Sequence, residues 1–181
     1  HARLLRRDGR HAVAGDGQEG SYGIHTDEAE FSGATQITAV AGEAKGYSAG
    51  FFTGNLTMIS DAVLNATGGK SGMFSIGAYS EGYLNITENS QLNTKAGLSD
   101  SEYSFGIAAV IVAFRDTATV ESFGNTAAIY SINDIALVYD SPYIIVSEDT
   151  NPENAVEWDG ENSLAAYSKN DEIIESLYKY V

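Results

Sequence analysis

The sequence contains no cysteine and only two prolines among its 181 residues. Without cysteine the protein can form neither disulfides nor thiolate metal sites, and it has no cysteine nucleophile. Both prolines, Pro142 and Pro152, lie in the last quarter of the chain. The segments before them can therefore donate backbone hydrogen bonds at every position, as strands inside a sheet must.

Basic residues are also scarce, with 10 Lys and Arg against 25 Asp and Glu, which gives a net charge of -15. This charge excludes sequence-independent binding to nucleic acid and disfavours anionic membrane surfaces. The chain has no run of about 18 apolar residues, the length that a membrane-spanning helix needs. The sequence thus predicts no nucleic-acid partner and no membrane insertion, while 43% hydrophobic residues suffice for a core.

Motifs for catalysis and metal binding are lacking as well. The three histidines, His1, His11 and His25, lie near the start, and neither H-E-x-x-H, a P-loop nor a G-x-S-x-G elbow occurs. Acid-rich turns at 27–28 and 149–159 are the places where calcium would bind, but the G-G-x-G-x-D repeat is missing. The sequence therefore predicts no catalytic residues, no metal site and no cofactor.

The chain does contain a repeat of Ser-x-Gly, whose glycines at 23, 50, 77 and 106 are separated by 27, 27 and 29 residues. Three apolar columns keep nearly the same period, with separations of 27, 28 and 28 residues. The columns are Ala29, Leu56, Leu84 and Val112; Phe31, Met58, Ile86 and Phe114; and Ile37, Leu64, Leu92 and Val120. Such a fixed period indicates a repeat architecture.

Within each repeat, apolar and polar residues alternate over short runs separated by turn residues, as in half-buried strands. A unit of 27–28 residues with about three short strands fits one coil of a parallel β-helix, stacked on the next at about 4.8 Å. We therefore predict an all-β protein, a right-handed parallel β-helix (β-solenoid) of about five rungs. Residues 1–146 form the repeats, with 1–20 as an atypical first rung or cap, and acidic residues 147–181 form a C-terminal cap that is either helical or strand-rich.

Two orientations of the Ser-x-Gly strand are open. The favoured one turns the aromatic ladder of Tyr47, Phe74 and Tyr103 inward, which places Ser48, Ser75 and Ser104 outside. The opposite one internalises the serines and exposes the aromatic residues. At the start of the chain, Arg10 takes the position of Ile37 in the preceding repeat, so this first rung is frayed or serves as a polar cap.

The pattern Ser-Tyr-Gly-Ile, an Ile-Thr or Leu-Thr strand, and then Ala-x-x-Gly or Ala-Thr-Gly-Gly is carried by residues 21–24, 37–42, 56–69 and 104–107. It resembles the Gly- and Ala-rich β-helix repeats of large surface or secreted proteins of gut Firmicutes. This resemblance covers residues 21–125 and implies a right-handed parallel β-helix, an extracellular setting, and contact with carbohydrate or a host surface. It carries over no catalytic residue.

The leading functional hypothesis is a non-enzymatic extracellular module of a bacterial cell surface, used for adhesion or carbohydrate binding, or as a spacer in a larger surface protein. Sugar rings need aromatic faces, and Tyr79, Tyr83 and Trp158 are the candidate ligand-binding residues. The alternative is a polysaccharide-active hydrolase or lyase that uses turn carboxylates as acid and base. Its candidates are Asp27, Glu28, Glu30, Asp100, Glu102 and Asp116. A third interpretation, a trimeric fibre segment, predicts an oligomer.

Overall fold

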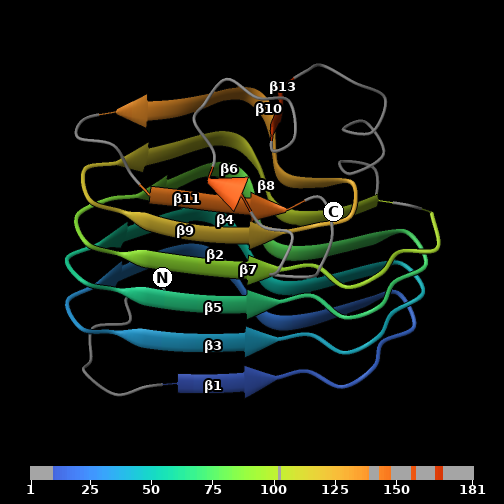
Figure 1. Cartoon of the computed structure of the whole chain (residues 1–181). Coiled ribbons are helices and arrows are strands. Elements are labelled where there is room, and N and C mark those ends of the chain that lie inside the picture. The colour runs from blue at the N-terminus through green and yellow to red at the C-terminus, as the bar shows by residue number, and fades with distance from the viewer. Residues whose placement is uncertain (1–9, 102, 139–142, 148–155, 158–165, 169–181) are drawn as a thin grey trace.

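The computed structural model describes residues 10–101, 103–138, 143–147, 156–157 and 166–168. These residues form an all-β, parallel β-solenoid of about four turns, with no helix in the described part of the chain (Figure 1). The prediction of a β-solenoid is confirmed, with about one turn fewer than expected. In the same residues, no helix is long and apolar enough to cross a membrane.

Each turn of the solenoid contributes two strands, one short and one long, rather than the three short strands predicted. The short strands are β1 (Arg10–Val13), β3 (Gln36–Val40), β5 (Val63–Thr67), β7 (Gln91–Lys95), β9 (Thr119–Phe123) and β11 (Tyr143–Ser147). The long strands are β2 (Gly20–Ser32), β4 (Tyr47–Ile59), β6 (Phe74–Ile86), β8 (Tyr103–Arg115) and β10 (Ala127–Val138). Figure 1 shows the short strands stacked in one sheet in front of the long ones.

Two further short strands follow the last turn. The seven-stranded sheet has the order β1-β3-β5-β7-β9-β11-β12, and β12 (Val156–Glu157) pairs antiparallel with β11. The six-stranded sheet has the order β13-β10-β8-β6-β4-β2, in which β13 (Ala166–Ser168) runs parallel to β10. Most of the predicted C-terminal cap at 147–181 lies outside the described residues.

Strand pairing follows the predicted columns. Leu56 pairs with Leu84 and Leu84 with Val112, while Ile37, Leu64, Leu92 and Val120 pair in sequence on the other sheet. Arg10 pairs with Ile37, as the repeat predicts, and is exposed on the terminal strand. The repeat read from the sequence is therefore the hydrogen-bonding register of the solenoid.

Each long strand bends in its middle, which is why it occupies the length of two predicted strands. The register between β4 and β6 shifts between Thr53 and Leu56, where β6 has one residue more. At the bend, the hydroxyl of Thr53 donates to the Asn55 carbonyl at 2.9 Å, and that of Ser80 donates to the Tyr83 carbonyl at 2.9 Å. These local bonds give partners to backbone carbonyls at the corner.

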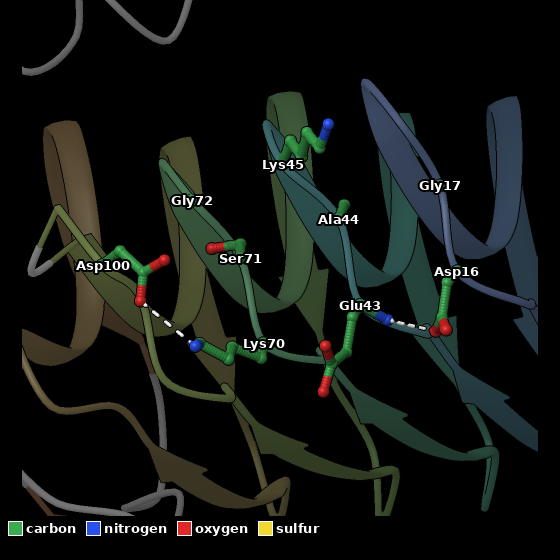
Figure 2. A pocket seen from close by; sticks show the side chains of 9 residues that line it. All are labelled: Asp16, Gly17, Glu43, Ala44, Lys45, Lys70, Ser71, Gly72 and Asp100. Atoms are coloured by element: carbon green, nitrogen blue, oxygen red, sulfur yellow. Dashed lines mark hydrogen bonds and ion pairs between the residues drawn. The ribbon is translucent and has the colours of Figure 1, made fainter.

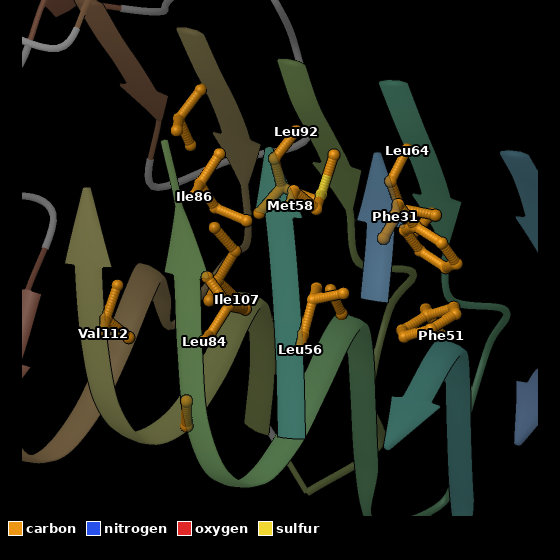
Figure 3. Close-up of a cluster of buried hydrophobic side chains, with 14 of the residues drawn as sticks. Phe31, Phe51, Leu56, Met58, Leu64, Leu84, Ile86, Leu92, Ile107 and Val112 are labelled. Carbon is orange, nitrogen blue, oxygen red and sulfur yellow. The ribbon is translucent and has the colours of Figure 1, made fainter. Parts of the chain in front are cut away.

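The interior of the coil is filled by the apolar columns. Figure 3 shows Leu56, Leu84 and Val112 side by side on successive strands, and all three are fully buried. Phe51, Met58 and further apolar residues complete the same cluster. Because each residue packs on its equivalent in the next turn, the core is one continuous stack.

The Ser-x-Gly serines point into the coil, which corrects the favoured orientation. Ser48 and Ser75 are 0% exposed. The Ser75 hydroxyl donates to the Gly69 carbonyl of its own turn at 2.7 Å and accepts the Gly97 amide of the next turn at 2.7 Å. Ser21, Ser48 and Ser104 make equivalent pairs of bonds. The backbone amides and carbonyls at the corner need hydrogen-bond partners inside the coil, and this requirement outweighs the preference for an apolar interior.

The aromatic ladder lies on the opposite face of the same strand half, because side chains alternate along a strand. Its members Tyr47 and Phe74 are buried as well, in a second cluster separate from the main core, and the partly buried Tyr103 packs against this cluster. Tyr47 stacks on Phe74 with ring centroids 5.2 Å apart, and Phe74 on Tyr103 at 5.0 Å. The favoured orientation is wrong because it assumes that only one face of the strand is buried, whereas both faces of this half of the long strand are covered.

The glycines of the repeat bring the two sheets close together next to the serine bonds. A Cβ at Gly23 would lie 2.6 Å from the Val40 amide nitrogen, and one at Gly77 would lie 2.8 Å from that of Lys95. Real Cβ atoms do not approach backbone this closely, so only glycine fits the column. The Ser-x-Gly repeat is thus explained by one hydrogen-bonded corner per turn.

Ser75→Ala tests the importance of the serine bonds. We expect it to lower the free energy of unfolding by about 2 kcal/mol, because a backbone carbonyl and a backbone amide lose their partner. The matched control is Ser71→Ala, since Ser71 is equally buried but its hydroxyl has no hydrogen-bond partner. That control should not lower stability, because it breaks no hydrogen bond and removes a buried hydroxyl that lacks a partner. Urea denaturation followed by circular dichroism measures both, and equal losses would contradict the assignment.

Candidate ligand-binding cleft

A cleft of about 860 Å³ opens where the aromatic ladder ends, at the first turns of the solenoid. Its apolar lining comes from Tyr22, Tyr47 and Met73, and its polar lining from Gln18, Glu19 and Lys45, with Gly20 and Gly46 between them. The residues belong to the starts of β2 and β4 and to the turns before β2, β4 and β6. Three turns of the chain therefore contribute to one cleft.

A missing side chain ends the ladder. In the strand register, Gly20 of β2 takes the position that Tyr47, Phe74 and Tyr103 hold in the following turns. The ring of Tyr22 lies over Gly20, where an added Cβ would come within 2.8 Å of the tyrosine hydroxyl. The stack consequently stops at Tyr47, and Tyr22 presents its ring at the open end.

Tyr22 is half-buried and held by neighbouring rings. Its centroid lies 5.2 Å from that of Phe52, edge to face, and 5.3 Å from that of His25. His25, which is exposed, also packs against Phe52 at 4.5 Å. These contacts fix the ring without covering it, and burial raises the pKa of the Tyr22 hydroxyl above its usual value of 10.0.

A second, smaller groove of about 320 Å³ lies along the turn residues (Figure 2), and Lys45 lines both hollows. Its polar lining is Asp16, Glu43, Lys45, Lys70, Ser71 and Asp100. Asp16 Oδ1 accepts the Glu43 amide at 2.9 Å, and Lys70 Nζ lies 3.4 Å from Asp100 Oδ1. The Lys70–Asp100 pair is mostly exposed, so it contributes little to stability.

Of the predicted ligand-binding residues, the structure describes Tyr79 and Tyr83, and neither lines the cleft. Tyr79 is only 4% exposed, with its ring 5.0 Å from Phe52 in the second cluster, and therefore has no free face for a ligand. Tyr83 is 47% exposed, but it follows the bend of β6 and does not line the cleft. Trp158 lies outside the described residues.

The sequence patterns do not single out the cleft residues Tyr22, Tyr47 and Met73. Tyr47 belongs to the ladder that the sequence predicts to point inward, and Tyr22 belongs to the Ser-x-Gly repeat. The available signal was Gly20, which aligns 27 residues before Tyr47 and marks where the aromatic column stops. The polar residues of the cleft come from turns, and the repeat period does not determine where side chains in turns point.

The carboxylates of the enzyme alternative are dispersed. Asp116 accepts the Thr87 hydroxyl at 2.6 Å, and Asp100 pairs with Lys70. Asp27, Glu28 and Glu30 are exposed on β2, and Glu102 lies outside the described residues. In the part of the chain that is described, no group of three or more His, Asp or Glu side chains is placed to hold a metal ion.

Comparison with known proteins gives no match to a protein family, a curated protein or a solved structure. The chemistry of the cleft is therefore the basis for any functional proposal.

The raised pKa of Tyr22 predicts a pH dependence of stability. The folded state holds the phenolic proton more tightly than the unfolded state does, so this proton adds to the free energy of unfolding below pH about 10. That addition is lost as pH rises above this value. In Tyr22→Phe, the loss of unfolding free energy between pH 8 and pH 11 should be smaller than in the wild type. Denaturant titrations at both pH values measure it, and an equal loss in the two proteins would contradict the burial of this hydroxyl.

Proposed function

We propose that this β-solenoid is a non-enzymatic extracellular module of a bacterial cell surface that binds carbohydrate in the cleft lined by Tyr22, Tyr47 and Met73. The supporting observation is the combination of the half-buried Tyr22 ring and polar groups in one cleft of about 860 Å³. Binding sites for small ligands are concave and mainly apolar, with a few polar groups that fix orientation. The resemblance of the repeat to those of surface and secreted proteins supports the extracellular setting.

The chemistry of a sugar matches both sides of this cleft. The C–H face of a pyranose ring is apolar and slightly positive, so it packs on the negative face of an aromatic ring. Gln18 and Glu19 supply oxygen acceptors for sugar hydroxyls, and Lys45 supplies a donor. The rings need little reordering on binding, because Tyr47 is stacked on Phe74 and Tyr22 is packed against Phe52.

A structural spacer is the second candidate function. It is favoured by the regular register, in which each turn contacts its neighbours and the strands stack along one axis. A spacer needs no ligand, so binding experiments distinguish a spacer from a carbohydrate-binding module. The hydrolase or lyase alternative ranks below both, because Asp100 is the only one of its described candidate carboxylates that lines the cleft or the smaller groove.

The proposal predicts that Tyr22→Ala weakens glycan binding. The first step is a glycan array with the folded domain, with and without calcium, and the second is calorimetry with the best ligand. Loss of the stacking ring should raise the dissociation constant about tenfold or more, about 1.4 kcal/mol. Tyr83→Ala is the matched control, since this tyrosine is exposed outside the cleft and its loss should leave affinity unchanged.

Circular dichroism must show that both variants keep the β-solenoid. Lys45→Ala, which removes an exposed side chain at the edge of the cleft, is a further variant that should fold normally and bind more weakly. A blank array with folded protein would favour the spacer for the ligands tested. Loss of binding in Tyr83→Ala but not in Tyr22→Ala would place the site elsewhere.

A further inference from the structure

Gly20 is a glycine that the local backbone does not require. Its φ lies outside the left-handed region, where glycine is favoured. At Gly46, which lines the same cleft, an added Cβ would collide with the backbone carbonyl of Glu19. At Gly20, by contrast, the three atoms nearest to an added Cβ all belong to the side chain of Tyr22. The strand itself therefore tolerates a side chain at position 20, so the fold alone does not explain this glycine.

The place of the Tyr22 ring depends on that missing side chain. An added Cβ at Gly20 would lie 2.8 Å from the Tyr22 hydroxyl oxygen and 2.9 Å from its Cζ, closer than such atoms approach in proteins. Tyr22 can relieve this contact by changing its rotamer, so the ring would move rather than the strand. It would then leave its edge-to-face contact with Phe52, in which the centroids are 5.2 Å apart. Gly20 thus determines where the aromatic wall of the cleft lies.

A larger side chain at this position would fill the cleft. In the following turns the same column holds Tyr47, Phe74 and Tyr103, and their rings stack at 5.2 and 5.0 Å. Because Gly20 lines the cleft, a ring here would occupy the cleft or push Tyr22 into it. Such a ring would also add an aromatic contact that stabilises the solenoid. The first turn therefore lacks a stabilising contact at the point where the cleft opens.

We propose that Gly20 is a positioning residue of the cleft. Its missing side chain keeps the Tyr22 ring against Phe52 and keeps the end of the aromatic column open to a ligand. This inference rests on carbohydrate binding in the cleft, and it adds the residue that makes the first turn competent to bind. In the described turns that follow, the ring of Tyr47, Phe74 or Tyr103 fills the corresponding place.

The binding test uses Gly20→Ala, the smallest change that displaces the ring. Calorimetry is done with cellohexaose, the N-acetylglucosamine hexamer and the strongest ligand of the glycan array. We expect the dissociation constant to rise about tenfold, as in Tyr22→Ala, and Gly20→Ala to have no further effect in the Tyr22→Ala background. The matched control is Gly15→Ala on the same turn, where an added Cβ has no atom within 4 Å. Affinity should be unchanged in this control.

A second measurement needs no ligand. The nuclear Overhauser effect between the ring protons of Tyr22 and Phe52 reports the position of Tyr22 directly. We expect it in the wild type and in Gly15→Ala, and we expect it to weaken or vanish in Gly20→Ala. A glycine that served only the stability of the strand would leave this signal in place.

Gly20→Tyr tests whether the fold accepts the ring that the later turns carry. We expect the midpoint of urea denaturation to rise by about 0.5 M, because one more aromatic pair is formed. The same variant should bind none of the saccharides, because the cleft is filled. A lower midpoint would show that the fold itself excludes a side chain at this position, and the proposal would be overturned.

The outcomes distinguish this inference from carbohydrate binding itself. If no saccharide binds the wild type, but the Tyr22–Phe52 signal is lost in Gly20→Ala alone, carbohydrate binding fails and the positioning of Tyr22 by Gly20 stands. If the signal persists in Gly20→Ala, Gly20 does not position the ring and the inference is wrong. If the losses of affinity in Gly20→Ala and Tyr22→Ala add in full, Gly20 does not act through Tyr22, which also contradicts it.

Discussion

The structure depends on a serine hydroxyl that joins two backbone groups at the corner of each turn. Ser48 and Ser75 each donate to a glycine carbonyl of their own turn and accept a glycine amide of the next. Each serine therefore both closes a corner of its own turn and fixes the position of the following turn. The glycine two residues later allows the sheets to approach, so that the apolar columns behind it meet in register.

The same corner leads to the candidate site. Because Ser48 points inward, Tyr47 and Ala49 must point to the other face, where the aromatic ladder forms. The ladder is buried in the middle turns and ends at Gly20, and this end leaves Tyr22 accessible beside the polar turn residues. The repeat thus builds a platform of stacked rings, and Gly20, which departs from the aromatic column, leaves one end of that stack open.

The sequence predicts the period, the register and the apolar columns correctly, because stacking places equivalent residues on one another and so preserves their spacing. Leu56, Leu84 and Val112 lie where the 28-residue step puts them. It does not predict that Ser75 is inside, since periodicity gives alternation but not which face holds the core. Nor does the sequence predict the site. Whether Tyr79 is exposed depends on what covers the sheet, and the contacts of Gln18 and Lys45 depend on the path of the turns in space.

The most direct test of the account uses the two methionines of the chain. Met73 lines the cleft, whereas Met58 is 0% exposed in the interior. With ¹³C-labelled methionine methyl groups, addition of a saccharide that binds by calorimetry should shift the Met73 resonance in proportion to occupancy and leave that of Met58 in place. If the Met73 resonance stays unmoved when the protein is saturated with such a saccharide, binding occurs elsewhere and the cleft is not the site.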